Sequence, residues 1–350
     1  MASPIGFGIV GCGLVSEFHG RALADIPGAR LVAACDADAG RLNAFIKHFG
    51  GEGYSDFRKM IERPDIHVIN VCTPNHLHEE FVVQAAAHGK HVMVEKPPEM
   101  TLEKADRLID ACTKAGVKLS TVLQVRFRPA VVALKKAIDE GRFGRLLFMD
   151  TDMKWFRERS YYDRDSWRGA RSKEGGGVVM QHAFHYIDIL NWLSGGIVAV
   201  RAQTLNLLHR DIRVEDSALA FFHYTGGAVG TMTASTALYP GTEVRIGVYG
   251  ENGTVMIEGT KIREWRFREE QSGDRERIST ERSDLSAGTG ASDFGYLEHR
   301  AQIIDMIDAI RNNREPAITG RSGRATLAAV LAIYRSAESG KEISIKEETR

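Results

Sequence analysis

The 350-residue sequence has few cysteines, no excess charge of either sign and no long apolar run. Its four cysteines, Cys12, Cys35, Cys72 and Cys112, all lie in the first third of the chain and form no Cys-x-x-Cys pair. We therefore expect neither a disulfide framework nor a cysteine-based metal site. Three of these thiols lie at or near predicted strand ends, where a cysteine behaves as a small buried apolar residue. Cys12 is the exception, because the positive end of the following predicted helix would favour its thiolate.

Neither positive nor negative charge is in excess, because 46 Lys and Arg balance 46 Asp and Glu. The chain therefore has no net field to attract nucleic acid or an anionic lipid surface. No apolar segment reaches the length of a membrane span, and the N-terminal residues MASPIGFGIV lack the basic region, apolar core and cleavage site of a secretory signal. We expect a cytoplasmic protein whose partners are small molecules and other copies of the chain, with no nucleic acid and no membrane.

The length of the chain and its 43% of apolar residues suit two domains. In residues 1–124, predicted strands and helices alternate, which implies right-handed crossovers and a doubly wound parallel sheet of the α/β class. From residue 125 to 350, one helix over residues 129–140 is followed mostly by strands, and turn residues at 224–227 and 251–253 predict hairpins. The second domain is thus predicted to be α+β, with a large open, mainly antiparallel sheet whose unpaired face suits subunit packing.

The remaining elements of the second domain are also predicted from sequence patterns. Residues 157–177 are predicted to form a polar, aromatic loop, and residues 271–291, which are charged and rich in Ser and Gly, are expected to be mobile. Helices over residues 294–311 and 324–339 are predicted near the end of the chain. The predicted strands cover residues 146–155, 197–207, 216–224, 228–235, 243–249, 253–258 and 262–267.

Residues 5–36 have the order of a dinucleotide-binding unit: an apolar run, a glycine turn, a helical pattern, and a second apolar run that ends in an acid. Gly11 permits the turn, and Gly13 lets the backbone approach a pyrophosphate, towards which the helix points its free amides. Ser16 stands where the pattern expects a third Gly or an Ala, and its hydroxyl needs a partner. Asp36 would hydrogen-bond the adenosine ribose and repel a 2′-phosphate, which favours NAD over NADP. The alternative interpretation is a plain structural turn.

Further candidate cofactor residues follow other predicted strands, because ligands of an open α/β sheet collect at the carboxyl ends of its strands. The strand over residues 66–72 is followed by Thr-Pro-Asn-His, and the strand over residues 90–94 by Glu95 and Lys96. Two prolines after this charged pair stop the strand and hold the pair at the sheet edge. The candidate cofactor residues are Gly11, Cys12, Gly13, Leu14, Val15, Asp36, Thr73, Pro74, Asn75, His76, Glu95, Lys96, Gln124, Trp167 and Arg168.

A glycine triplet, residues 175–177, opens a segment that is predicted to begin in flexible backbone and to continue as a helix. Gln181, His185 and Asp188, at i, i+4 and i+7, share one face of this predicted helix. Oxidation of an alcohol needs a base with a pKa near neutral to take the hydroxyl proton, and His185 suits that role. Lys96 would hydrogen-bond the same oxygen and stabilise its developing negative charge. The alternatives are a structural histidine and a surface ion pair between the lysine and the preceding glutamate.

Two further groups of side chains have the chemistry of metal ligands. Neither group has a standard zinc spacing, so we expect no metal. The groups are His182, His185 and Asp188, and His76, His78 and Glu79.

These residues resemble the glucose-fructose oxidoreductase and inositol dehydrogenase family, Gfo/Idh/MocA, over nearly the whole chain. The resemblance implies an N-terminal Rossmann domain, a C-terminal domain with an open antiparallel sheet, homodimers or homotetramers formed through that sheet, and oxidation of sugars or polyols with NAD. It also places the catalytic lysine of the family at Lys96 and the catalytic histidine at His185. The matching segments are Gly8-Ile9-Val10-Gly11-Cys12-Gly13, Cys72-Thr73-Pro74-Asn75-His76, Glu95-Lys96-Pro97, Gly175-Gly176-Gly177 with His185 and Asp188, and Ala332-Ile333-Tyr334-Arg335-Ser336-Ala337.

One position departs from the inositol dehydrogenase pattern. Those members carry an aspartate four residues before the histidine, whereas this chain has Gln181, which can orient a hydroxyl but cannot share a proton. The segments Trp155-Phe156-Arg157, Tyr161-Tyr162 and Trp167-Arg168-Gly169 resemble members that oxidise C3 of hexoses, glycosides or nucleotide sugars. Aromatic faces suit sugar C–H surfaces and arginines suit carboxylates or phosphates, although these aromatics can also serve only to pack the loop. The candidate substrate residues are Lys96, Arg126, Arg157, Tyr161, Tyr162, Gln181, His182 and His185.

The sequence and the resemblance together predict NAD-dependent oxidation of a secondary hydroxyl of a sugar, glycoside, nucleotide sugar or related polyol. Two other functions stay open. One is a glycosidase of the same family that uses tightly held NAD for a transient oxidation and gives no net NADH. The other is a non-catalytic, NAD-binding regulator.

Overall fold

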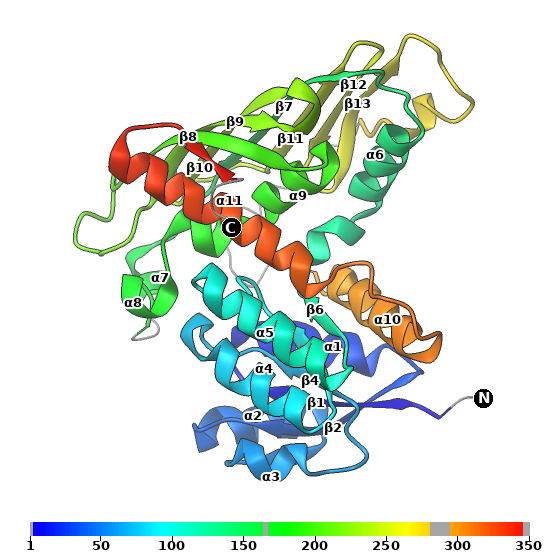
Figure 1. Cartoon of the computed structure of the whole chain (residues 1–350), viewed down its shortest axis with the longest axis vertical. Helices are drawn as coiled ribbons and strands as arrows, with labels where there is room; N and C mark the ends of the chain where they lie inside the picture. Colours follow the sequence, from blue (N-terminus) through cyan, green and yellow to red (C-terminus); the bar gives the residue numbers. More distant parts are fainter. Residues whose placement is uncertain (1–2, 164–166, 281–294, 346–350) are drawn as a thin grey trace. The chain divides into compact units, whose positions relative to one another are not determined.

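The first of two sheets is parallel throughout, and its strands lie in the order β3-β2-β1-β4-β5-β6. The computed structural model describes residues 3–163, 167–280 and 295–345, and Figure 1 labels most of its helices and strands. The order of the strands reverses between β1 and β4, which is the switch point of a doubly wound sheet and confirms the predicted class. The strands are β1 (Ile5–Val10), β2 (Ala29–Cys35), β3 (Glu52–Tyr54), β4 (Val68–Val71), β5 (His91–Val94) and β6 (Leu119–Thr121).

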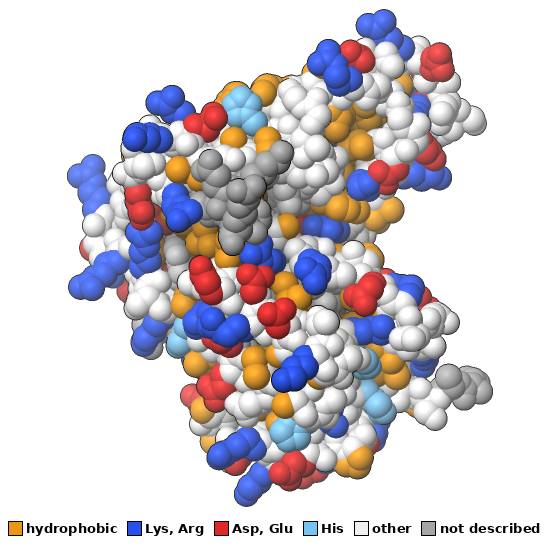
Figure 2. All heavy atoms as spheres, viewed as in Figure 1, with side chains coloured by type: hydrophobic (Ala, Val, Ile, Leu, Met, Phe, Trp, Pro, Cys, Tyr) orange, Lys and Arg blue, Asp and Glu red, His pale blue; other side chains and the backbone are white. Residues whose placement is uncertain are grey.

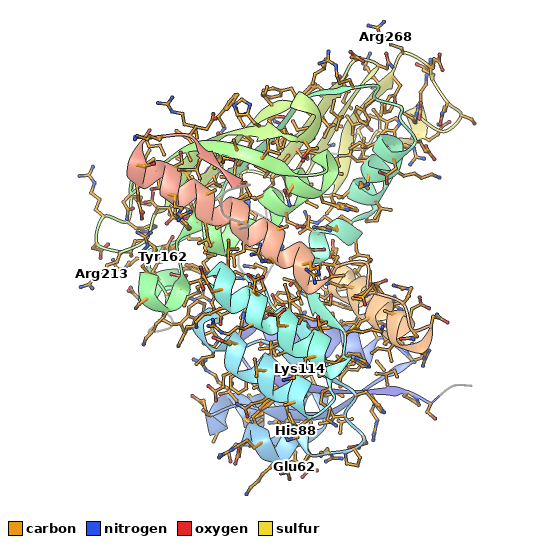
Figure 3. All side chains as sticks on the ribbon, in the orientation of Figure 1. Glu62, His88, Lys114, Tyr162, Arg213 and Arg268 are labelled. Atoms are coloured by element: carbon orange, nitrogen blue, oxygen red, sulfur yellow. The ribbon has the colours of Figure 1, made fainter. Side chains whose placement is uncertain are left out.

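The helices beside this sheet begin and end at the residue types that favour such ends. Asp38 caps α2 by accepting a hydrogen bond from the Arg41 amide, and Thr101 caps α5 in the same way. His88 and Lys114, labelled in Figure 3, lie at the C-terminal ends of α4 and α5, where basic groups suit the helix dipole. The helices are α1 (Leu14–Ala24), α2 (Ala39–Phe49), α3 (Phe57–Ile61), the 3₁₀ turn η1 (Asn75–Leu77), α4 (His78–Ala87) and α5 (Leu102–Ala115).

The chain divides into two compact units, and the first contains residues from two parts of the sequence, Met1–Gln124 and Gly295–Leu327. The sequence predicts that all residues after 124 form the second domain. The structure differs, because residues Gly295–Leu327 belong to the first unit. The cause is helix α10 (Leu297–Arg311), which buries Ile303, Met306 and Ile307 in the same apolar core as strand β1. An amphipathic helix in a sequence does not indicate which core it will join.

The second unit, residues Val125–Phe294 and Ala328–Arg350, contains the larger sheet. Its strands lie in the order β13-β12-β11-β7-β10-β9-β8-β14, and all neighbours are antiparallel except β7 and β10. The two predicted hairpins, β9 with β10 and β11 with β12, are confirmed. The strands are β7 (Leu146–Lys154), β8 (Ile197–Leu205), β9 (Ser217–Tyr224), β10 (Val229–Ser235), β11 (Arg245–Gly250), β12 (Gly253–Glu258), β13 (Lys261–Phe267) and β14 (Ile343–Ser344).

Helices of the second unit include short ones in the segment that we predicted to be an irregular loop, residues 157–177. This segment contains α7 and α8, with residues 164–166 outside the described part. The helices are α6 (Pro129–Asp139), α7 (Arg159–Asp163), α8 (Arg171–Glu174), the π-helical turn η3 (Val179–Ala183) and α9 (Phe184–Ser194). Helix α11 (Gly320–Ser339) has its first residues in the first unit and the rest in the second.

Asp274 lies in the segment that we expected to be mobile, residues 271–291, of which residues 281–291 are outside the described part. Its buried carboxylate accepts hydrogen bonds from the Arg142 guanidinium at 2.6 and 3.0 Å and from the Trp265 indole at 2.7 Å. The Arg142 hydrogen bonds, together with the other donors, hold the pKa of Asp274 well below its usual range. The described beginning of this segment is therefore anchored, which corrects our expectation.

Basic and acidic side chains are interspersed over the face of the molecule shown in Figure 2, in keeping with the balanced charge of the chain. Within the described ranges, none of the helices combines the length and the apolar character that a membrane span requires.

Candidate active site

The glycine turn between β1 and α1 has two glycines with different physical roles. Gly11 has φ +90°, and a Cβ at this position would lie 2.7 Å from the carbonyl of Cys72, so both conformation and packing require glycine. A Cβ at Gly13 would meet no atom of the described residues within 4 Å. The Ser16 hydroxyl donates a hydrogen bond to the Gly13 carbonyl at 2.6 Å, which supplies the partner that the sequence left open.

Helix α1 begins directly after Gly13 with no side-chain cap, so its first amides keep their capacity to bind an anion. Together with the open space at Gly13, this is the cradle that a pyrophosphate needs, and the residues present fit a dinucleotide. The first residues of the helix, Leu14 and Val15, present N–H groups of the kind that bind an anion.

This pair of glycines gives a prediction that separates folding from cofactor binding. Gly11→Ala should lower the free energy of unfolding by about 1–3 kcal/mol because the added methyl overlaps main chain. Gly13→Ala should leave the melting temperature unchanged and weaken NADH binding about tenfold or more, because the methyl fills space that the pyrophosphate approaches. Thermal denaturation and NADH fluorescence titration measure the two effects. Unchanged NADH affinity in the Gly13 variant would contradict this account.

Asp36 follows β2 and ties the end of that strand to the glycine turn. Its carboxylate accepts hydrogen bonds from the Cys12 amide at 2.7 Å and from the Asp38 amide at 2.8 Å. Burial and the nearby Asp36 carboxylate raise the pKa of the Cys12 thiol to about 12. These effects outweigh the end of the helix, so the expectation of a favoured thiolate at Cys12 is wrong. All four cysteines are free thiols.

The segments after β4 and β5 are linked by a buried histidine, His78. Its ring nitrogens lie 2.9 Å from the Thr73 carbonyl oxygen and 2.9 Å from the Pro97 carbonyl oxygen. Thr73 and Pro97 belong to the two predicted cofactor segments, and the peptide bond between Lys96 and Pro97 is cis. One side chain thus holds both segments at the carboxyl edge of the parallel sheet.

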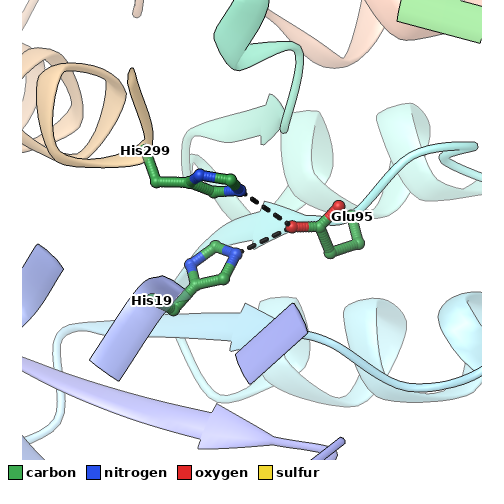
Figure 4. A group of neighbouring side chains, drawn as sticks. All are labelled: His19, Glu95 and His299. Carbon is green, nitrogen blue, oxygen red and sulfur yellow. Dashed lines mark hydrogen bonds and ion pairs between the residues drawn. The ribbon is translucent and has the colours of Figure 1, made fainter. Parts of the chain in front are cut away.

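Glu95 lies among two buried histidines, His19 of α1 and His299 of α10 (Figure 4). These three residues are the one candidate metal site in the described part of the chain. It is the only group of three or more histidine, cysteine and acidic side chains whose potential ligand atoms lie within 4.8 Å of one another. However, His19 Nε2 and Glu95 Oε1 are 2.8 Å apart, a hydrogen-bond distance. Two ligands of one tetrahedral zinc lie about 3.3 Å apart. The geometry is that of a hydrogen bond between His19 and Glu95, with His299 beside them.

In the second unit, close packing requires Gly176 and Gly177 of the glycine triplet, and backbone conformation favours glycine at position 175. Only Gly175 has a positive φ, +84°. A Cβ at Gly176 would lie 1.9 Å from the Tyr334 hydroxyl, and a Cβ at Gly177 would lie 1.9 Å from the Glu215 carbonyl oxygen. Our interpretation of this backbone as flexible is therefore corrected, because a sequence does not show what approaches a glycine.

The buried carboxylate of Glu215 holds the start of the helical segment that carries His182 and His185. It accepts hydrogen bonds from the Gly177 amide at 2.9 Å, the Val179 amide at 3.0 Å and the Tyr334 hydroxyl at 2.8 Å. Burial raises the pKa of Glu215, although these donors oppose the shift. Glu215 and the helix start therefore form one hydrogen-bonded unit.

The helical segment is π-helical at its start, which changes the register that we predicted. The π turn inserts about one extra residue into the helix between Gln181 and His185, so these side chains are offset from the i, i+4 alignment. Gln181 is buried and donates to the Glu174 carbonyl at 3.0 Å. Asp188 is also buried and forms a bidentate ion pair with Arg126 at 2.6 and 2.7 Å. His185 is half-buried.

The predicted aromatic and basic substrate residues come together within the second unit. The His182 ring lies 5.6 Å from Tyr161 between ring centroids, and Arg168 donates to the Tyr161 hydroxyl at 2.7 Å. Arg157 lies over the Tyr161 ring at 5.8 Å. Tyr162, labelled in Figure 3, is instead buried, with its hydroxyl 2.9 Å from that of Thr236.

The predicted residues thus fall into one set in each unit. Gln124 is the last residue of the first unit, and Trp167 and Arg168 belong to the second. The residues of the first unit follow β1, β2, β4, β5 and β6, at the carboxyl edge of the parallel sheet. The second unit contains Arg126, Arg157, Tyr161, Tyr162, Trp167, Arg168, Gln181, His182 and His185.

Comparisons with known proteins agree with this fold. Residues 5–123 match the model of an oxidoreductase family with an NAD-binding Rossmann fold, and residues 131–256 match the GFO/IDH/MocA C-terminal domain. The chain belongs to the Gfo/Idh/MocA oxidoreductase family. The sheet of the Rossmann domain and the open, mostly antiparallel sheet of the C-terminal domain are those that the resemblance implied.

Three relatives of this Gfo/Idh/MocA oxidoreductase show the range of the family. The crystal structure of the WlbA dehydrogenase from Bordetella pertussis, in complex with NADH and UDP-GlcNAcA, is 34% identical, with a TM-score of 0.88 and 98% of each chain covered. D-apiose dehydrogenase from Paraburkholderia graminis is 28% identical over 97% of this chain and 89% of the relative. Levoglucosan dehydrogenase from Pseudarthrobacter phenanthrenivorans is 28% identical over 71% of this chain and 72% of the relative. The chain is an NAD-dependent oxidoreductase, and its Rossmann domain binds NAD(H).

Several residues that shape the sites of this Gfo/Idh/MocA oxidoreductase were missed by sequence reasoning. His19 and His299 are far apart in the chain and meet only around Glu95. Glu215 lies two residues before strand β9. In the sequence it is only an acidic residue before an apolar run, and nothing there indicates its role. The pairing of His78 with two carbonyls could have been suspected only from its place between two predicted cofactor segments.

Proposed function

We propose that this protein oxidises a secondary hydroxyl of a sugar or sugar derivative, with Lys96 and His185 acting on the same hydroxyl. The observation that carries the proposal is the pairing of an NAD-binding glycine turn with a lysine two residues past the end of β5, at the same edge of the parallel sheet. A ligand-binding edge of this kind is where an α/β sheet positions a cofactor. The similarity to dehydrogenases of sugars supports the substrate class.

Each residue has a defined task in this proposal. NAD, when bound, accepts the hydride from the carbon that carries the hydroxyl. His185 takes the hydroxyl proton as general base, a role that suits an imidazole at neutral pH. The Lys96 ammonium donates a hydrogen bond to the hydroxyl oxygen and stabilises the negative charge that develops on it. In the reverse direction the same groups return the proton to the oxygen.

For the substrate we propose a sugar that carries an acidic group, with UDP-GlcNAcA as the first compound to test. Two features support this choice: WlbA, at 34% identity over 98% of the chain, was crystallised with UDP-GlcNAcA, and the second unit presents Arg168 beside Tyr161 and His182. Arginine binds carboxylates and phosphates through paired hydrogen bonds, and tyrosine suits the apolar face of a sugar ring.

An activity screen tests the proposed function. The protein is mixed with NAD and, in separate reactions, UDP-GlcNAcA, UDP-GlcNAc, levoglucosan, D-apiose and myo-inositol, and NADH absorbance is followed. We expect NADH to accumulate with at least one of these sugars. NADH binding without turnover on the panel would support a regulator instead. Cleavage of a glycoside without net NADH would support the glycosidase function.

We also propose that the protein forms a homodimer or homotetramer through the open sheet. Leu219 and Phe221 alternate with buried residues along β9 and are 49% and 38% exposed, so they form part of an apolar face. Phe221→Lys should convert the assembly to monomers in sedimentation velocity, because a buried charge opposes the interface. Val83→Lys, at a residue of α4 with a similar exposure of 37%, is the control and should leave the assembly intact. A monomeric wild-type protein would contradict this proposal.

A further inference from the structure

Glu95 is buried directly beside Lys96, and all of its oxygen contacts are within the first unit. Its Oε1 atom accepts a hydrogen bond from His19 Nε2 at 2.8 Å, and His299 Nε2 lies 3.9 Å from the same oxygen (Figure 4). Its Oε2 atom accepts a hydrogen bond from the Lys96 amide at 3.2 Å. One oxygen therefore faces the two histidines, and the other holds the main chain of Lys96.

The hydrogen bond between His19 and Glu95 has a defined direction. The other ring nitrogen of His19, Nδ1, lies 2.9 Å from the side-chain amide of Asn70 on β4. The amide N–H₂ group of Asn70 faces Nδ1, so Nδ1 accepts this hydrogen bond and Nε2 carries the proton of the ring. Nε2 therefore donates to the Glu95 carboxylate.

The cluster joins the two parts of the first unit on which the proposed chemistry depends. His19 lies on α1, whose first amides follow the glycine turn, and Asn70 lies on the adjacent strand β4. His299 lies on α10, and its ring stacks on Phe18 of α1 with centroids 5.5 Å apart. Glu95 is therefore connected both to the cofactor-binding helix and, through its own backbone, to Lys96.

A buried carboxylate at this position costs free energy, because its charge is removed from water, and an apolar residue would avoid that cost. Its presence therefore suggests a function other than packing. Burial raises the pKa of Glu95, but the hydrogen bond from His19 and the nearby Lys96 outweigh burial and lower the pKa to about 2. Burial lowers the pKa of His299 to about 3. At neutral pH the cluster thus contains an ionised carboxylate beside a neutral His299.

We propose that Glu95, held by a hydrogen bond from His19 and flanked by His299, is a positioning residue that fixes the main chain of Lys96 relative to the cofactor-binding start of α1. This inference rests on the proposed function, in which the Lys96 ammonium must meet a hydroxyl next to the bound cofactor. Glu95, His19 and His299 act through Lys96 and are assigned no contact with the substrate. A lysine displaced by about 1 Å can lower the rate of such a reaction about 100-fold.

The variant Glu95→Gln tests the proposal, because it keeps the shape of the side chain and removes its charge. We expect kcat to fall between about 10-fold and 100-fold, a much larger change than that in KM for the sugar or in the NADH dissociation constant. In the Lys96→Ala background the same change should have no further effect, since Glu95 acts through the lysine. Independently of activity, hydrogen exchange measured by mass spectrometry should rise at least fivefold in the peptide that spans residues 95–100.

Controls and a second variant keep the outcome decisive. Glu62→Gln, at an exposed residue of the same unit, should change neither kcat nor the exchange of residues 95–100. If Glu95→Gln does not fold, His299→Leu leaves the bond between His19 and Glu95 intact and should give a smaller effect of the same kind. Unchanged exchange in residues 95–100, or a loss of kcat that adds in full to that of Lys96→Ala, would overturn the proposal. If the wild-type protein oxidises no sugar, the proposed function fails while the exchange result still decides whether Glu95 positions this segment.

Discussion

Replacing Lys96 with alanine is expected to lower kcat for NAD reduction by about 100-fold to 10,000-fold, because the oxygen of the substrate loses its hydrogen-bond donor. The NADH dissociation constant should change much less than kcat, since we predict that the glycine turn and α1 make the pyrophosphate contacts. Single-turnover kinetics with stopped-flow absorbance measure the chemical step directly, and NADH titration measures binding.

The expected pattern for His185→Asn is the same, with a loss of similar size. If both residues act on one hydroxyl, the double variant should lose little more than either single variant. Lys114→Ala, at an exposed residue near the end of α5, is the control and should retain full activity. A Lys96 variant that keeps its kcat would contradict the proposed role of the ammonium, and losses that simply add would contradict a shared hydroxyl.

Gly177→Ala is expected to have the second large effect, on both stability and activity. The added Cβ would lie 1.9 Å from the Glu215 carbonyl oxygen, a distance that no real methyl group tolerates, so the main chain must move. Overpacking of this kind costs about 1–3 kcal/mol of unfolding free energy. The same movement displaces the start of the helical segment that carries His185, because Glu215 accepts the Gly177 and Val179 amides. We therefore expect kcat to fall as well.

Chemical denaturation and steady-state kinetics check this prediction together. Gly295→Ala is the matched control, because a Cβ at Gly295 would meet no described atom within 4 Å. It should change neither the unfolding free energy nor kcat. A stable and fully active Gly177 variant would show that the close approach of Glu215 does not position the helix.

Much of the fold was predictable because its elements have strong local patterns. The buried strands of the first sheet are continuous apolar runs, and Gly11 and Asp36 mark the ends of β1 and β2. In the second sheet, alternation of buried and exposed residues, as in β9, locates the strands to within about two residues. These patterns do not show which elements pack against each other. Helix α10 has a clear helical pattern, but only the structure shows that Ile303 and Met306 join the core of the first unit.

In the candidate sites, too, residues within local motifs could be predicted from the sequence, whereas contacts between distant residues could not. Lys96 and His185 were predicted because motifs surround them, whereas Glu95, His19 and His299 form a cluster from three distant parts of the sequence. The reactivity of Cys12 was misjudged because the helix end is a local feature, while burial and the Asp36 carboxylate depend on the fold. The π turn before α9 was also missed, because the spacing of the side chains in the sequence does not distinguish a π turn from an α-helix.

The most direct test of the central claim is a crystal structure of the protein with NADH and UDP-GlcNAcA. The account predicts that Lys96 Nζ and a ring nitrogen of His185 both lie within about 3.2 Å of one sugar hydroxyl, whose carbon faces the nicotinamide. A structure in which either side chain lies far from that hydroxyl, or in which the two approach different parts of the sugar, would contradict the account.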